Sequence, residues 1–480
     1  MPSENESKYD ICSRLLDEGK YKEALILSES IEFPLHRAAI FIDAGLAVGK
    51  SGKVREGTEI FEKSISSEQI VQKYSKSSLL YNAANGRSSI YKLRQRRRKS
   101  VVPTNDDDLR QAKKLYRDAL SALDNANGVF ESQVLVNYGN CLSQFGRYIE
   151  AIEYYQRAIE ADPTNGMAAG NLGIELEHAA WLIGRYRHEY IGLAHELLTR
   201  ALGPNMHLNY GSMPAIQGFQ AVQERLQNFI DLHREPIVPP KPLEIKEGVK
   251  KQNEYMKFCL DNALFLNPWV GDKFLSPGIT DDISFGSIVT PVGDDYLVPE
   301  LLRILNEIKE SFTTARYLYF LSQNQSDLID RISEMTLYYG VDPFEIKGLY
   351  IGLCKTAYAR AFDVLDKVAR IINVYFGIGK RESPFWTTFA EKQSLGQEQK
   401  IRFAARQAIC EKKNYGLYAL ADLCIDYFES EHVDFKTIDK RRNRITHDYL
   451  NVKLDMLQED NNGNSVVGLD ELQNQTIKVL

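Results

Sequence analysis

The stretch that decides the fold of this chain is LVNYGNCLSQFGRYIEAIEYYQRAIEADPTN, residues Leu135–Asn165. In this stretch, small residues recur at intervals, at Gly139, Gly146, Ala151 and Ala158. Large side chains such as Tyr155 lie between them. Small side chains let two helices approach closely, and large ones fill the space that remains between them. Pro163 ends the second helix, because a proline ring cannot continue one. The stretch therefore predicts a pair of antiparallel helices.

The same skeleton recurs on both sides of this stretch. A shift of 34 residues places Gly173 in register with Gly139. Less complete copies are found at Gly19, Tyr21 and Ala24; at Gly45, Gly52, Gly57 and Phe61; at Ala112, Tyr116 and Ala119; and at Ala194, Leu198 and Ala201. The recurrence predicts about five helix pairs, which cover roughly residues 8–235.

A 34-residue period with these small and large positions resembles the tetratricopeptide repeat. The resemblance implies that residues 1–235 form a helical array in which each pair packs against its neighbours. Arrays of this kind present extended surfaces that bind proteins or peptides. A protein partner or trigger is therefore expected to dock on this part of the chain.

An insertion in the third helix pair carries a concentrated basic run, KLRQRRRK at Lys92–Lys99. Such a run can follow a phosphate backbone, because the release of counterions from a nucleic acid favours these contacts. The alternative is a solvated loop whose charge is neutralised by the nearby acidic residues Asp106–Asp108. With that alternative open, the candidate RNA contacts in this run are Arg96, Arg97 and Arg98.

Composition places the chain among ordinary globular proteins. It has 480 residues, 44% hydrophobic and 26% charged, and at about 150 residues per domain this length predicts about three domains or two large ones. A net charge of −6 argues against a protein that coats nucleic acid with its whole surface. The apolar runs are shorter than the roughly 20 residues of a membrane span, and the N-terminus is polar. With six scattered cysteines, we expect a cytoplasmic protein without membrane contact.

Prolines divide the chain. The segment EPIVPPKPLEIKEG holds four of them, and each fixes φ and excludes a helix. Residues 236–248 are therefore expected to form an extended linker between the repeats and a second helical domain at 249–456. In that domain helical spacing is clearest at Leu301–Leu321, Tyr350–Tyr375, Lys400–Phe428 and Thr437–Met456. A long loop is expected at Asn267–Pro299, and a flexible polar tail at 457–480.

The most informative stretch for function is DKRRNRITHDYL, residues Asp439–Leu450. A helix that begins at Thr437 would bury one apolar stripe, formed by Ile438, Ile445, Tyr449, Val452 and Met456. Asn443 and His447 are four residues apart, so they share the outer face of that helix. The long side chain of Arg442 reaches the same place from its margin. Arg441 and Arg444 add more positive field there.

These residues match the motif of the HEPN family (higher eukaryotes and prokaryotes nucleotide-binding). In that motif an arginine, often followed by a polar residue, precedes a histidine by four to six residues. The sequence FCLDNALFLNP at Phe258–Pro268 is also similar to the start of the HEPN branch that is coupled to tetratricopeptide repeats in bacteria. Many members of the family are metal-independent endoribonucleases, often toxins or antiviral effectors, whose protomers pool their motifs in a dimer.

The resemblance implies a role for each motif residue. RNA cleavage without a metal uses the ribose 2′-OH as nucleophile, and it needs a group that exchanges a proton near pH 7. His447 would be that general base or acid. Arg442 would hold the phosphate and its growing charge, and Asn443 would orient His447 or the phosphate. The RNA-binding residues around them would be Lys440, Arg441 and Arg444, and neither a metal nor an organic cofactor is expected.

Together these features predict an all-α protein with an N-terminal tetratricopeptide-like solenoid and a C-terminal HEPN-like bundle. The predicted activity is cleavage of single-stranded RNA or tRNA loops at a composite site in a homodimer or higher oligomer. One alternative is a non-catalytic scaffold that binds protein or RNA. Another is a protein that is paired with an antitoxin and silenced by modification near the motif, for which Tyr449, two residues after His447, is the candidate position.

Overall fold

The structure, a computed structural model, describes residues 7–98, 101–123, 127–183, 187–208, 213–232, 250–266, 281, 283, 285, 293, 296–324, 327–339, 344–395, 400–429, 441, 442, 444, 445, 450–453 and 466–479. The predicted linker at 236–248 and most of the loop predicted at Asn267–Pro299 lie outside these residues. The chain forms two compact units. The first is Met1–Pro239 with Lys412–Ala419, and the second is Pro240–Glu411 with Leu420–Leu480.

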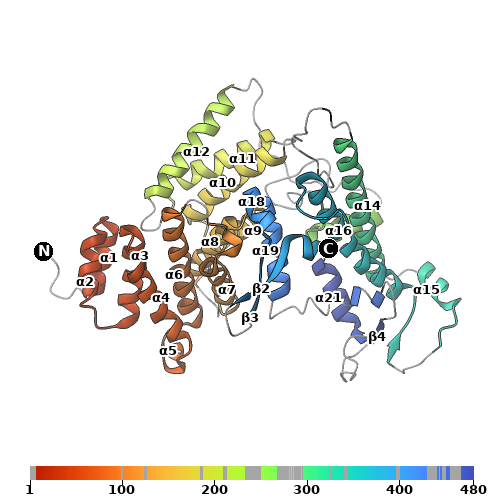
Figure 1. The fold of residues 1–480 in the computed structure, drawn as a ribbon, viewed down its shortest axis with the longest axis horizontal. Helices are drawn as coiled ribbons and strands as arrows, with labels where there is room; N and C mark the ends of the chain where they lie inside the picture. The colour runs from red at the N-terminus through yellow and green to blue at the C-terminus, as the bar shows by residue number, and fades with distance from the viewer. Residues whose placement is uncertain are drawn as a thin grey trace. The chain divides into compact units, whose positions relative to one another are not determined.

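The first unit is built from consecutive helix pairs (Figure 1). The pairs are α1 (Lys8–Asp17) with α2 (Tyr21–Ser28), α3 (Pro34–Val48) with α4 (Ser51–Ile65), α6 (Lys76–Arg97) with α7 (Asp107–Ser121), α8 (Gly128–Gln144) with α9 (Tyr148–Ala161), and α10 (Gly166–Ile183) with α11 (Arg187–Ala201). Shorter or single elements accompany them: α5 (Glu68–Lys73), η1 (Pro103–Asn105) and α12 (Met213–Leu232). The prediction of a helical repeat array is confirmed.

Small residues set the distance between paired helices, as the spacing predicts. A Cβ atom on Gly139 would lie 2.7 Å from the ring of Tyr155, which is fully buried on the partner helix α9. A Cβ atom on Gly57 of α4 would lie 2.6 Å from the carbonyl oxygen of Ala38 in α3. Because that oxygen belongs to a rigid helix backbone, the pair cannot accept a larger residue there without separating.

The basic run Lys92–Lys99 is not the loop considered above. Helix α6 continues through it to Arg97. Arg94 pairs with both Asp106 and Asp108, and these carboxylates are buried where α7 begins. Their charge therefore needs a guanidinium beside it, because an unpaired buried carboxylate is unfavourable. The acidic residues do neutralise part of the run, but they do so through a packed helix end.

From residue 250 onward the chain is again mainly helical. The helices are α13 (Lys250–Asp261), α14 (Leu297–Gln323), α15 (Asp327–Glu334), α16 (Leu349–Phe376), α17 (Phe385–Phe389), α18 (Gln407–Lys412), α19 (Tyr415–Glu429) and α21 (Leu469–Val479). A three-stranded sheet has the order β1 (Glu345–Ile346), β4 (Asn451–Lys453), β5 (Val466–Gly468), with β1 antiparallel and β5 parallel to β4. An antiparallel hairpin joins β2 (Ala390–Leu395) to β3 (Lys400–Ala405).

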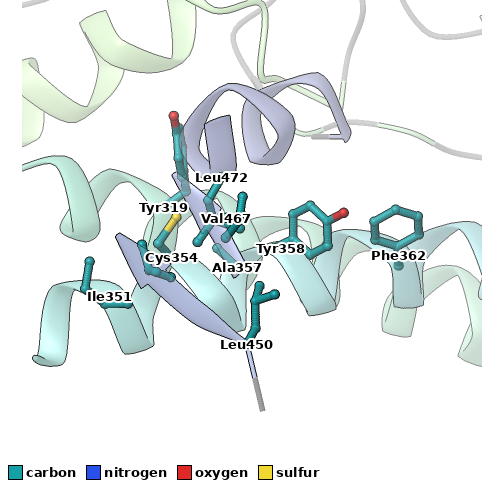
Figure 2. Close-up of a cluster of buried hydrophobic side chains, with 10 residues drawn as sticks. Tyr319, Ile351, Cys354, Ala357, Tyr358, Phe362, Leu450, Val467 and Leu472 are labelled. Atoms are coloured by element: carbon teal, nitrogen blue, oxygen red, sulfur yellow. The ribbon is translucent and has the colours of Figure 1, made fainter. Parts of the chain in front are cut away.

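The long helices α14 and α16 pack along each other, and the core of the second unit lies on α16 (Figure 2). Cys354, Tyr358 and Phe362 face it from α16. The chain segments after the motif cover them with Leu450, Val452, Val467 and Leu472, all nearly or fully buried. The end of the chain is therefore part of the core of this unit.

Three sequence-based expectations are wrong at this end of the chain. The helix expected over Thr437–Met456 does not continue past Leu450, because Asn451–Lys453 forms β4. The tail expected at 457–480 instead contributes β5 and α21 to the core. The helix expected over Lys400–Phe428 begins with β3 and is divided into α18 and α19. Strand β4 pairs with residues more than 100 positions before it and 15 positions after it, whereas β3 pairs with β2 in a local hairpin.

The fold class is nonetheless the predicted one, because helices make up nearly all of both units. In the parts of the chain that the structure describes, every helix is too short or too polar to cross a lipid bilayer.

Substitution of Gly57 tests the close approach of α3 and α4. Gly57→Ala places a methyl group against the Ala38 carbonyl, and we expect the free energy of unfolding of the array to fall by about 1–3 kcal/mol. The matched control is Gly52→Ala in the same helix, where nothing lies within 4 Å of the new Cβ. That change should be neutral or stabilising by up to about 1 kcal/mol. Urea unfolding followed by far-UV circular dichroism measures both, and equal stabilities would contradict the packing argument.

Candidate active site

Arg442 lies in a described helical turn and is held by carboxylates of α16. Its Nη2 atom donates a hydrogen bond to Oδ2 of Asp366 at 2.7 Å and lies 3.8 Å from Oδ1 of Asp363. The side chain is 22% exposed, so the guanidinium sits at the surface of the unit with part of its face open. Its central carbon is 5.8 Å from the ring centroid of Phe362, which adds a cation–π contact.

Asp366 is itself fixed on its other oxygen. Its Oδ1 atom accepts a hydrogen bond from the backbone N–H of Phe385, at the start of α17, at 3.1 Å. One carboxylate therefore connects α16, α17 and the turn that carries Arg442. A hydrogen bond between two charged groups is stronger than a neutral one. This carboxylate accordingly sets the orientation of Arg442.

The remaining catalytic candidates, Asn443 and His447, lie outside the described residues, as does Lys440. Their expected position on the outer face stays a prediction. Ile445, expected in the buried stripe, packs against the core cluster on α16.

Arg441 occupies a different environment from Arg442. Its side chain is 5% exposed, and Nη1 donates to Oε1 of Glu471 in α21 at 2.6 Å. The same glutamate oxygen accepts from the amide of Gln475 at 2.9 Å. The structure thus places Arg441 inside the unit, where it ties the motif turn to α21, and this position does not suit the RNA contact expected of it. Arg444 is half-buried.

The other candidate RNA contacts, Arg96, Arg97 and Arg98, are exposed at the end of α6 in the first unit. Arg96 donates to the carbonyl of Leu46 at 3.0 Å, and Arg97 to that of Gly49 at 3.2 Å. These carbonyls end helix α3, where cations are favourable because of the helix dipole. The two arginines therefore have a structural role, and RNA contact by them stays a prediction.

Two carboxylates and a lysine near the motif were missed from the sequence. Asp363 and Asp366 are three residues apart on a predicted helix, and this spacing alone could have marked them as one acidic face. Lys355 donates to the carbonyl of Leu450, three residues after His447, and burial lowers the pKa of its ammonium group. No local pattern indicates that lysine. Among the described residues, no three His, Cys, Asp or Glu side chains are grouped to share a metal ion.

The fold and this geometry define a helical repeat array joined to a helical domain with a carboxylate-held arginine. Residues 293–480 match the family of LA2681-like HEPN domains, and residues 132–165 match the tetratricopeptide repeat. Both resemblances inferred from the sequence are thereby confirmed. The HEPN match extends to the end of the chain, in agreement with the burial of β5 and α21.

Solved structures similar to the chain are tetratricopeptide-repeat proteins. One is YrrB, a TPR protein with an unusual peptide-binding site, at 16% identity over 46% of this chain and 90% of that chain, with a TM-score of 0.24. Another is MamA MSR-1, at 18% identity over 45% and 95%, with a TM-score of 0.23. The TPR2AB domain of yeast Sti1 in complex with pHSP90 matches at 16% identity over 46% and 84%, with a TM-score of 0.20. Comparison with curated proteins finds no match.

Removal of the carboxylate opposite Arg441 tests the structural role of that arginine. Glu471→Ala leaves a buried guanidinium without its partner, and we expect the second unit to lose about 2 kcal/mol of stability. This expected loss of stability is smaller than the loss for a fully buried ion pair, because Glu471 is partly exposed. Urea unfolding, followed by hydrogen-exchange protection of α21, measures the change. Asn474→Ala, an exposed position of the same helix, is the control, and equal effects of the two would refute the role.

Proposed function

We propose that the chain is a metal-independent endoribonuclease of HEPN type. The observation that carries the proposal is the placement of Arg442, the arginine of the family motif. It lies partly exposed, and Asp366 fixes its orientation. A guanidinium that is held rigidly at a surface suits the stabilisation of charge on a phosphate, because no reorganisation is needed when the charge develops.

The proposed reaction is transesterification of the RNA backbone. His447 takes the proton of the ribose 2′-OH, the 2′-oxygen forms a bond to phosphorus, and the bond from phosphorus to the 5′-oxygen breaks. The 5′-oxygen takes a proton from a protonated imidazole, and a 2′,3′-cyclic phosphate remains. Arg442 stabilises the charge that grows on the phosphate oxygens, and Asn443 orients His447 or the phosphate.

This reaction needs one imidazole as base and one as acid. A single chain offers one motif histidine, so we propose that two copies face each other and that His447 of the partner subunit supplies the second group. The substrates that fit an open, two-sided site are single-stranded RNA or tRNA loops. An enzyme of this kind that cleaves RNA in its own cell would act as a bacterial toxin or antiviral effector in the cytoplasm.

We assign control of the activity to a protein partner on the repeat array. Amide side chains form a continuous polar strip across three consecutive helix pairs. Asn137 donates to Asn85 at 3.1 Å, Asn171 donates to Asn140 at 2.8 Å, and the hydroxyl of Tyr155 donates to Asn140 at 2.9 Å. Amides both donate and accept hydrogen bonds, as a peptide backbone requires of its binding surface. This strip supports peptide recognition on the first helices of the pairs.

The alternative is a scaffold in which the second unit binds RNA or protein without cleavage. The pair of Arg442 with Asp366 is compatible with it, because an arginine can bind a phosphate without catalysis. In the second alternative, a protein silenced by modification, a group attached to Tyr449 would block the motif. Assays of cleavage and of binding, carried out on the same samples, separate these possibilities.

Loss of either motif residue should abolish cleavage. With labelled RNA in EDTA, we expect the rate to fall at least about 100-fold for His447→Ala, because proton transfer is lost. A similar loss is expected for Arg442→Ala, because the phosphate charge is left without its donor. Denaturing gels and mass spectrometry of the products measure the rate and the cyclic phosphate.

Arg370→Ala, an exposed arginine on α16, is the matched control and should cleave like the wild type. Cleavage by all variants at one rate would refute the site. RNA binding without cleavage by the wild-type dimer would favour the scaffold.

Asp366 should act as a positioning residue for Arg442. Asp366→Asn keeps an acceptor for the Phe385 N–H but loses the ion pair, so we expect kcat to fall about 10-fold with little change in KM. Asp363→Asn should change kcat less than about threefold, because that carboxylate is 3.8 Å from the guanidinium. Steady-state kinetics with a short RNA measures both. An unchanged kcat for Asp366→Asn, or a change confined to KM, would contradict this role.

A further inference from the structure

Helix α15 and the residues after it expose a group of large apolar side chains. Leu328, Ile332 and Met335 are spaced by four and three residues, so they lie on one face of the helix and its C-terminal end. This group, here named the α15 patch, consists of Leu328, Ile332, Met335, Leu337, Tyr338 and Tyr339, which are 43–85% exposed. No residue of α15 is buried. Figure 1 shows α15 standing out from the α14–α16 pair.

The other sides of α15 differ in character. The hydroxyl oxygen of Ser333 accepts from the backbone N–H of Leu349 at 3.1 Å, so one side rests on the start of α16. Asp330 lies opposite the patch. Asp327, Arg331 and Glu334 form a charged row beside it. An eight-residue helix is not stable alone in water, and most helix stability comes from burial of the apolar face. The contact with α16 leaves that face uncovered.

The exposed area of the α15 patch fits a dimer interface. A large side chain presents on the order of 150–250 Å² when free, so the patch exposes roughly 700 Å². The largest apolar patch of a typical monomer is about 300–600 Å². Each partner in a standard protein interface buries about 800 Å². The patch is therefore larger than an ordinary surface feature and close to what one side of a stable interface requires.

We propose that the α15 patch binds the α15 patch of a second copy of this chain. A two-fold interface must be self-complementary, and the charged row meets that condition. In an antiparallel pair, Arg331 can face the partner's Asp327 or the partner's Glu334. The row carries more negative than positive charge, which disfavours an anionic lipid surface or RNA as the occupant.

Strand pairing connects this interface to the motif. The segment after the patch forms β1, and Glu345 and Ile346 of β1 pair with Lys453 and Val452 of β4. Strand β4 begins four residues after His447. The inference rests on the proposed function in one respect, because the composite site supplies the reason for two copies. It names a surface through which two copies can associate.

Two glutamate substitutions on the α15 patch test the interface in the full-length chain. For Leu328→Glu with Ile332→Glu, we expect the dimer dissociation constant to rise about 100-fold or more, because both glutamates would enter an apolar contact. Asp330→Lys, on the opposite face, also changes the net charge by two units, in the opposite direction, and should leave the dimer intact. Sedimentation velocity over a concentration series measures all three proteins, and circular dichroism verifies their folding.

Cross-linking gives a second measurement that does not depend on the double variant. Ile332→Cys should form a symmetric dimer with a short bismaleimide, and the wild type, whose described cysteines are buried or half-buried, is the control. A monomeric wild type at every concentration would overturn the proposal. It would also be overturned by a double variant that dimerises normally, or by patch-dependent co-sedimentation with vesicles of neutral or anionic lipid.

RNA cleavage by the same proteins separates this inference from the proposed function. If the protein forms a patch-dependent dimer but does not cleave RNA, the proposed interface is supported and the proposed nuclease activity is refuted. If the double variant is monomeric and cleaves RNA at the wild-type rate, the proposed nuclease activity is supported and the link between the dimer and the site is refuted.

Discussion

The arrangement of the second unit depends on the burial of Leu450 and Val452 against α16. These two side chains are almost completely buried beside Tyr358 and Phe362. Their burial fixes the chain immediately after the motif, so the motif turn is held at its C-terminal end. At its N-terminal end, Arg441 is held by Glu471. Because both anchors are nonlocal, the position of Arg442 follows from the core of the unit and not from its own short turn.

The same dependence explains which parts of the candidate site could be predicted. Arg442 was found because the motif is local, with all its members within six residues. Asp366 was not found because it is 76 residues earlier in the chain, and no pattern around it specifies a partner. Arg441 and Arg442 are adjacent and chemically identical, yet one is inside the unit and the other at its surface. That difference is set by Glu471 and Asp366, which only the tertiary structure brings to them.

The fold, like the candidate site, has parts that the sequence predicts and parts that it does not. The array could be predicted because each repeat buries its small residues against the next helix in sequence, as Gly139 does against Tyr155. The sequence predicts helix where β3 and β4 form, because strands of six and three residues are too short for their period to be distinguished from that of a helix. Val452 satisfies a helical stripe and a strand equally well. It forms a strand because it pairs with Ile346, 106 positions before it, and with Val467, 15 positions after it.

The short strand β1 gives the α15 patch a physical connection to the motif. Two residues of ladder are too few to be stable alone, so β1 depends on the order of the chain on either side of it. Burial of the patch in a dimer would hold residues 337–339, shortly before β1, and β1 in turn pairs with β4 shortly after the motif. Linkage requires the reverse as well, so a substrate whose binding at the motif favours the pairing of β1 with β4 would tighten the dimer. Oligomerisation and activity would then share one structural element.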